Sequence, residues 1–184
     1  MDVITISRQL GSQGTEVAKR VASSLNYRLV WRELINEAAM RSGAPDVALA
    51  TIDDLGLLGI SPSLSGHKAY IDAVKSVMEE LAGEGNVVIV GRAGQMILRG
   101  RPNVLHVQIV APMDTRVERV ARNQNITLEG ARAQVEASDS HRKKYLKRFY
   151  HVNWEDSSLY DLTINTARLN IDAAADLICL RCKQ

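Results

Sequence analysis

The first 25 residues contain an apolar run, a glycine turn and a periodic segment in immediate succession. Residues 3–6 (VITI) are too few for a helix and predict a buried strand, and residues 11–14 (GSQG) form a small-residue turn. Val17, Val21 and Leu25 then share one stripe of a helix. Such a turn aims several backbone N–H groups at one point, and the helix adds its unpaired N-terminal donors and positive dipole end. The segment therefore predicts a phosphate site.

This turn partly matches the phosphate-loop pattern GxxxxGK[ST]. In residues 8–15 (RQLGSQGT) the final hydroxyl is retained as Thr15, but Gly14 stands where the pattern has lysine. The cation that normally reaches the β- and γ-phosphates is thus absent from its usual place. Taken alone, the turn is equally compatible with a tight connection. Thr15, or Ser12 before it, could also serve only as a helix N-cap.

Length and composition predict one domain with a full hydrophobic core. The chain has 184 residues, of which 46% are hydrophobic, and a formal net charge of only +2. That charge argues against a surface built for non-specific nucleic-acid binding. No apolar stretch approaches the length of a membrane span and no basic, apolar leader opens the chain, so we expect a cytosolic protein.

Strands and helices alternate along the rest of the sequence. Further strands are predicted at residues 27–30, 87–90, 104–110 and 160–164, and helices at 31–40, 70–81, 114–123, from 128 onward and at 171–180. This alternation predicts an α/β fold with a mostly parallel sheet and right-handed crossovers. Residues 42–67, between the predicted helices 31–40 and 70–81, are rich in Gly, Pro and Ser. We expect irregular structure there, with a short helix near 47–55 and a flap. Asp53 and Asp54 within it favour a solvated turn.

Two cysteines, Cys179 and Cys182, have the CxxC spacing of redox motifs. Redox motifs place their reactive thiolate at a helix N-terminus, whereas these residues end the predicted last helix. Two cysteines also leave a zinc site short of ligands. We therefore expect structural thiols.

Basic residues recur where an anion would bind. Arg92 directly follows a predicted central strand, and ligands of parallel sheets gather at the carboxyl ends of strands, so Arg92 should lie near the glycine turn. Arg116, Arg119 and Arg122 recur at three-residue steps, as either a solvated helix face or an anion clamp. Five of the seven residues in 142–148 are basic, a pattern that fits a lid over a nucleotide or an RNA-binding patch.

Four stretches, in this order, carry a resemblance to a known family. They are ITISRQLGSQGTEVAKRVA, VVIVGRAGQMIL, NVLHVQIVAPMDTRVERV and YDLTINTARLNIDAAADLI, and together they span nearly the whole chain. With them the sequence resembles the P-loop nucleoside monophosphate kinases, most closely the cytidylate kinase-like family. The resemblance implies a three-layer α/β P-loop kinase fold with a five-stranded parallel sheet. It also implies a single domain with a core of about 1–30, 84–122 and 158–184, a helical monophosphate-binding insertion of about 31–83 and a lid of about 123–157.

The same resemblance implies an activity and a set of site residues. Such enzymes transfer the γ-phosphoryl group of ATP, with Mg²⁺, to a nucleoside monophosphate, so small nucleotides are the expected partners and neither a membrane nor nucleic acid is expected. Arg92 would bind the acceptor phosphate, and Arg119 and Arg142 would act from the lid. Thr15 would contact Mg²⁺. The donor nucleotide would lie at residues of the turn: Arg8, Gly11, Ser12, Gln13, Gly14 and Thr15.

Several residues depart from the ordinary cytidylate kinases. Besides Gly14, Trp31 replaces an aspartate that opens the monophosphate site, and Ala93 replaces an acidic residue. Glu16 puts a carboxylate in the first helical turn, which disfavours anion binding unless a metal intervenes. Arg8 could replace the missing cation or be an ordinary surface residue. The sequence thus leaves open the acceptor base and sugar, the oligomeric state, and an alternative function as a nucleotide-binding sensor or partner-binding module without catalysis.

Overall fold

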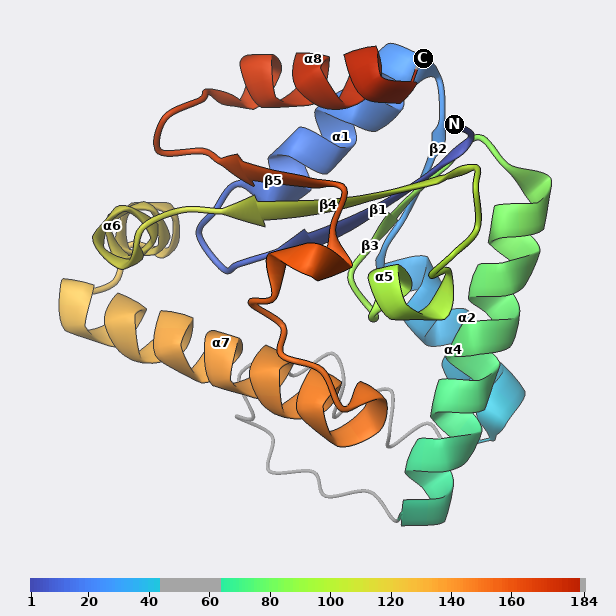
Figure 1. Cartoon of the computed structure of the whole chain (residues 1–184). Helices are drawn as coiled ribbons and strands as arrows, with labels where there is room; N and C mark the ends of the chain where they lie inside the picture. Colours follow the sequence, from blue (N-terminus) through green and yellow to red (C-terminus); the bar gives the residue numbers. More distant parts are fainter. Residues whose placement is uncertain (44–63, 183–184) are drawn as a thin grey trace.

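A five-stranded parallel sheet forms the centre of the protein (Figure 1). The computed structural model describes residues 1–43 and 64–182. The strands are β1 (Val3–Arg8), β2 (Arg28–Val30), β3 (Val87–Val90), β4 (Val104–Val110) and β5 (Leu162–Asn165), in the spatial order β2-β3-β1-β4-β5. Every adjacent pair is parallel, which confirms the predicted sheet.

Helices cover both faces of this sheet. On one face lie α1 (Gly14–Leu25) and α8 (Ile171–Cys182), side by side in Figure 1, and on the other lie α2 (Arg32–Ser42) and α4 (Leu64–Glu84). A short α5 (Gly94–Ile97) follows β3. Beyond β4, α6 (Met113–Gln124) leads into α7 (Leu128–Tyr150), a single 23-residue helix below the sheet in Figure 1. The three-layer arrangement is the one predicted.

Alternation of side chains along the strands builds two cores. In β3, Val87 and Ile89 pack toward α2 and α4, whereas Val88 and Val90 pack toward α1 and α8, and all four are buried. A strand buried on both faces needs an uninterrupted apolar run, which is why residues 87–90 were predicted with the correct bounds. Cys179 and Cys182 belong to the α1/α8 core and form no disulfide.

The last strand begins later than predicted. It was expected at residues 160–164 but spans Leu162–Asn165, because a short 3₁₀ helix, η1 (Ser157–Leu159), precedes it. The N–H of Tyr160 donates to the carbonyl of Ser157 and closes that turn. Tyr160 is therefore not part of β5, and its side chain packs against the cluster of Ala93, Leu146 and Trp154.

Some sequence predictions lie outside the described residues. The short helix expected near residues 47–55, with Asp53 and Asp54, falls within 44–63. Among the helices that are described, none has the length and apolarity needed to cross a membrane.

Two neighbouring residues of α8 offer a test of this core. Ile178 is fully buried, whereas Leu177 is 45% exposed. We expect Ile178→Ala to lower the free energy of unfolding by about 2–5 kcal/mol through lost transfer energy and a cavity, and Leu177→Ala to change it by about 0.5 kcal/mol or less. Urea denaturation of both variants measures the contrast. Equal losses would mean that α8 is not docked on the sheet through this face.

Candidate active site

Three connecting segments meet at the carboxyl edge of the sheet. The turn after β1, the Gly91–Ala93 turn after β3 and the start of α6 after β4 leave three adjacent strands, because β1 lies between β3 and β4. The N–H of Gly91 donates to the carbonyl of Ile6 at 2.9 Å, so the turn bearing Arg92 begins directly beside the end of β1. This edge is where parallel sheets bind ligands.

Hydrogen bonds to β4 fix the start of the glycine turn. The N–H of Gln9 donates to Ile109 O at 3.1 Å, and the Gln9 side-chain oxygen accepts from the N–H of Ala111 at 3.0 Å. Ser12 is fully buried and donates to Gln9 O through both its N–H (3.3 Å) and its hydroxyl (2.8 Å). The Ser12 hydroxyl therefore holds the turn together.

Gly11 and Gly14 are required by close packing. A Cβ atom at Gly11, where φ is +78°, would lie 2.6 Å from the carbonyl oxygen of Arg116, and one at Gly14 would lie 2.5 Å from Cβ of Arg8. Real Cβ atoms essentially never approach other atoms this closely. A lysine at position 14 would collide with the end of β1, which gives the missing loop lysine a steric cause.

The first turn of α1 presents unpaired backbone donors. Gln13 is in the left-handed conformation (φ 60°) and caps α1 without a side-chain hydrogen bond. The carbonyl of Gln13 accepts from the N–H of Val17 at 3.0 Å. The N–H groups of Gly14, Thr15 and Glu16 precede that bond and have no acceptor within the helix. Together with the dipole, such donors suit an anion, and the phosphate site stays a prediction.

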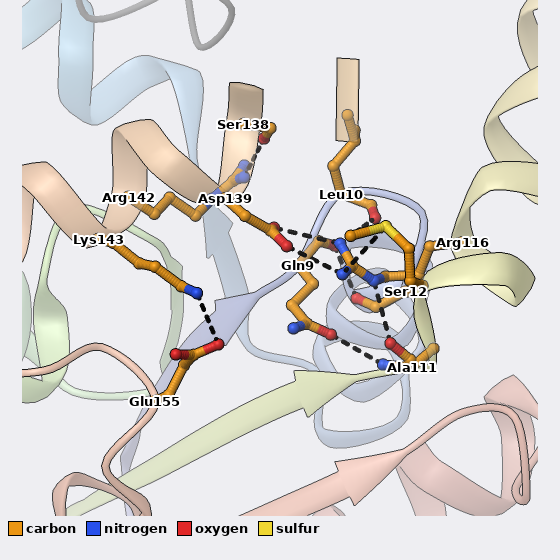
Figure 2. Close-up of polar contacts among 11 residues, drawn as sticks. Gln9, Leu10, Ser12, Ala111, Arg116, Ser138, Asp139, Arg142, Lys143 and Glu155 are labelled. Atoms are coloured by element: carbon orange, nitrogen blue, oxygen red, sulfur yellow. Dashed lines mark hydrogen bonds and ion pairs between the residues drawn. The ribbon is translucent and has the colours of Figure 1, made fainter. Parts of the chain in front are cut away.

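Arg116 joins this turn to the helix α7, as Figure 2 shows. Its side chain is 4% exposed and forms a two-pronged ion pair with Asp139, which is 13% exposed, at 3.2 and 2.9 Å. The same guanidinium donates to Ala111 O at 3.0 Å and to Leu10 O at 3.4 Å. Arg116 thus bonds the residue after β4, the residue before Gly11 and α7 at once.

The three arginines of α6 have three different surroundings. Arg116 is buried, Arg122 is exposed, and Arg119 is half-buried. Arg119 donates to Gly11 O at 3.4 Å and to Thr166, at 3.0 Å to its hydroxyl and at 2.9 Å to its carbonyl. Arg119 lies on α6, before the residues 123–157 expected to form the lid, and its role as a lid residue stays a prediction.

Thr166 is a site residue that the sequence analysis missed. Its hydroxyl donates to Ser12 O at 2.7 Å, so the segment after β5 holds the carbonyl side of the glycine turn. The available signal was its position just past a predicted strand, at the same carboxyl edge as the turn.

Arg8 lies toward β3 rather than along the turn. Its guanidinium carbon is 5.5 Å from the centre of the Trp31 ring, and a Cβ atom at Gly91 would lie 3.0 Å from Nη1 of Arg8. The side chain of Arg8 thus lies between the glycine turn and the segment that carries Arg92. Arg92 and Ala93 both adopt left-handed conformations, at φ 54° and 56°.

Arg142 lies on α7 above a buried tryptophan. It donates to the Ser138 hydroxyl, and its guanidinium carbon is 5.9 Å from the Trp154 ring centre. Trp154 is 1% exposed, and its indole N–H donates to the Ser7 hydroxyl of β1 at 2.9 Å. Trp154, which sequence reasoning did not single out, therefore ties the end of α7 to the strand that precedes the turn.

Several side chains of the basic run of α7 contact other residues of the protein. Tyr145 packs against Phe149, with ring centres 5.2 Å apart, and against Tyr150. Lys143 pairs with Glu155 at 2.9 Å, as Figure 2 shows. The aromatic side chains of this run thus contact one another, and the lid and RNA-binding interpretations both stay predictions.

Comparison with known proteins decides the family. Residues 3–168 match the model of the cytidylate kinase-like family. The chain belongs to this family. Its relatives include a cytidylate kinase from Methanocaldococcus jannaschii, 27% identical over 96% of this chain and 94% of that protein. Another, from Pyrococcus horikoshii, is 32% identical over 90% of this chain and 80% of that protein.

Solved structures agree on the fold. An uncharacterised protein from Eubacterium ventriosum superposes with a TM-score of 0.78 at 25% identity, covering 100% of this chain and 99% of the other. A shikimate kinase from Bacteroides thetaiotaomicron superposes with a TM-score of 0.58 at 15% identity over 100% and 99% of the two chains. The cytidylate kinase-like chain therefore has the P-loop kinase fold.

The described residues hold no group of three or more His, Cys, Asp or Glu side chains suited to a metal. Mg²⁺ in kinases is held largely by substrate phosphates and water, with one or two protein oxygens. Thr15, partly exposed in the first turn of α1, offers such an oxygen beside the anion site. The residues present therefore fit an ion shared with a bound polyphosphate.

The ion pair between Arg116 and Asp139 should be structural. We expect Asp139→Asn to lower the free energy of unfolding by about 3–5 kcal/mol, because it leaves a buried guanidinium without its counter-charge. Asp114 pairs with Arg132 at 2.6 Å but is 82% exposed, so Asp114→Asn should cost about 1 kcal/mol or less. Chemical denaturation compares the two. A loss for Asp139→Asn as small as that for Asp114→Asn would refute the structural role.

Proposed function

We propose that this protein is a phosphotransferase that moves the γ-phosphoryl group of ATP to a nucleoside monophosphate. The observation that carries the proposal is the first turn of α1, where unpaired N–H groups follow a tightly held glycine turn. Membership of the cytidylate kinase-like family supports the same chemistry and favours a cytidylate-like acceptor. Small nucleotides, rather than nucleic acid, would then be its partners, and the cytosol its compartment.

The donor side would be formed by the glycine turn. The backbone of residues 11–15 would donate to the phosphates of ATP, while Arg119 and Thr166 hold the carbonyl side of the turn in place. Thr15 would contribute its hydroxyl to Mg²⁺, which would neutralise charge on the β- and γ-phosphates. In this arrangement Glu16, exposed in the same turn, faces a site whose charge the cation has reduced.

The acceptor side would be formed next to β3. Arg92, in the turn after β3, would bind the phosphate of the acceptor, and Arg8 lies between that turn and the donor side. Transfer of a phosphoryl group requires alignment of two polyanions and neutralisation of the charge on the transferred group, and arginine grips phosphate oxygens in pairs. Arg8 thus replaces the absent lysine from a different position. Arg142 would act from α7 when the lid covers both substrates.

A second function is favoured by one specific observation. Gly14 cannot be exchanged for the usual lysine without a collision, so the loop itself carries no cation. A protein of this kind could bind nucleotide as a sensor without catalysing transfer. The two functions differ in turnover and not in ATP binding.

A panel of acceptors distinguishes the phosphotransferase from the sensor. The protein is incubated with Mg-ATP and each common ribo- and deoxyribonucleoside monophosphate, and ADP formation is measured against a control without acceptor. We expect ADP to form with at least one monophosphate, pyrimidine acceptors being favoured. Saturable ATP binding in calorimetry without turnover on any acceptor would instead establish the sensor, and no binding of any nucleoside triphosphate would exclude both.

Arg92→Ala tests the acceptor side. Hydrogen bonds to charged groups contribute about 1.5–3 kcal/mol, so we expect the acceptor KM to rise about tenfold to a hundredfold, with the KM for ATP unchanged. Arg122→Ala is the matched control, because Arg122 is exposed on α6, and it should leave both constants unchanged. If Arg92→Ala instead raised the KM for ATP alone, Arg92 would belong to the donor side.

A further inference from the structure

The side chain of Arg8 follows a defined path across the carboxyl edge of the sheet. Arg8 is the last residue of β1, and its backbone pairs with Ile109 of β4. Its stem passes Gly14, where an added Cβ would lie 2.5 Å from Cβ and 3.1 Å from Cγ of Arg8. Its Nη1 reaches Gly91, 3.0 Å from the place that a Cβ of that residue would take. The two glycines thus leave room for the two ends of one arginine side chain.

Trp31 lies at the end of this path. It directly follows β2, which β3 separates from β1 in the sheet, and its side chain is half-buried. The guanidinium carbon of Arg8 is 5.5 Å from its ring centre, within the range of a cation–π contact, for which tryptophan is the strongest side-chain partner. Trp31 also packs against the core between the sheet and α1 and α8. The core therefore restrains the ring that contacts the cation.

An aromatic ring holds a guanidinium in a way that suits a phosphate site. It attracts the cation through its π face, so it neither uses an N–H donor nor cancels the positive charge. A carboxylate in the same place would pair with the guanidinium and compete with any phosphate oxygen for it. Trp31 therefore restrains the cation without neutralising it.

The position of this cation connects the two sides of the proposed site. Gly14 is the first residue of α1, on the donor side, and Gly91 begins the turn that carries Arg92, on the acceptor side. In phosphoryl transfer, negative charge on the transferred group has to be stabilised while the group moves from donor to acceptor. A cation fixed between the two sides is placed to stabilise that charge.

We infer that Trp31 is a positioning residue, which holds the guanidinium of Arg8 beside Gly91 so that its charge acts on the phosphoryl group during transfer. The inference rests on the proposed phosphotransferase function. An arginine side chain has many rotamers, and electrostatic stabilisation of a transition state is most effective when the charge is fixed beforehand. Trp31 therefore acts on the rate of transfer more than on the binding of either substrate.

A double-mutant cycle tests this inference. Trp31→Leu, Arg8→Ala and the double variant are compared with the wild type for kcat and for the KM of ATP and of the best acceptor. We expect kcat to fall about 100-fold in Arg8→Ala and about tenfold in Trp31→Leu, with smaller changes in either KM. The double variant should match Arg8→Ala within about twofold, because without the guanidinium the ring has nothing to position. Losses that multiply in the double variant, or no loss for Trp31→Leu, would overturn the inference.

Two further variants distinguish positioning from a purely structural role. Trp31→Phe keeps an aromatic face, so its kcat should stay within about threefold of the wild type. Leu29, two residues earlier on β2, packs against the same core as Trp31. Leu29→Ala should therefore lower the melting temperature but leave kcat within about twofold of the wild type. Equal losses of kcat in Trp31→Phe and Trp31→Leu, or a comparable loss in Leu29→Ala, would show that Trp31 acts through the core and not through Arg8.

The cycle also separates failure of the inference from failure of the proposed function. If the wild type turns over no acceptor, the phosphotransferase proposal fails, and the same four proteins are compared for the Kd of Mg-ATP and of inorganic tripolyphosphate by calorimetry. A weaker Kd in both single variants, with no further weakening in the double variant, would still support positioning of Arg8 by Trp31. Additive changes, unchanged Kd values, or no binding to the wild type would overturn it.

Discussion

The guanidinium of Arg116 is the interaction on which the arrangement of the site depends. A cation with a side chain only 4% exposed is tolerated where hydrogen bonds and a counter-charge compensate for lost hydration. Arg116 obtains them from Leu10, Ala111 and Asp139, which belong to the glycine turn, the end of β4 and α7. Arg116 therefore joins the segment after β1, the segment after β4 and α7.

Close packing around the glycine turn explains its unusual sequence. Gly11 lies against the backbone of Arg116, and Gly14 lies against Arg8, so neither position has room for a side chain. A phosphate loop packed this tightly cannot contain the customary lysine. The positive charge around the site comes instead from arginines on other segments, Arg8 at the end of β1 and Arg119 on α6, and their positions depend on the tertiary fold.

The sequence predicted the layers of the fold well because they follow from local patterns. The apolar runs of β3 and β4 gave the observed bounds, whereas α5, with four residues, was too short for a periodic signal. The roles of the arginines could not be predicted in the same way. Three-residue spacing on α6 does not reveal that Arg116 meets Asp139, and nothing local links Trp154 to Ser7, 147 positions earlier. Contacts of this kind exist only after the chain has folded.

Long-range contacts also determine where the helix α7 lies. Asp139 bonds Arg116, Lys143 pairs with Glu155, and the Trp154 beneath Arg142 bonds β1, so α7 is attached to the core at successive points along its length. A basic helix without such attachments would be a solvated surface. Attached in this way, α7 is linked through Arg116 to the turn that precedes α1, and the first N–H groups of α1 have no acceptor within that helix.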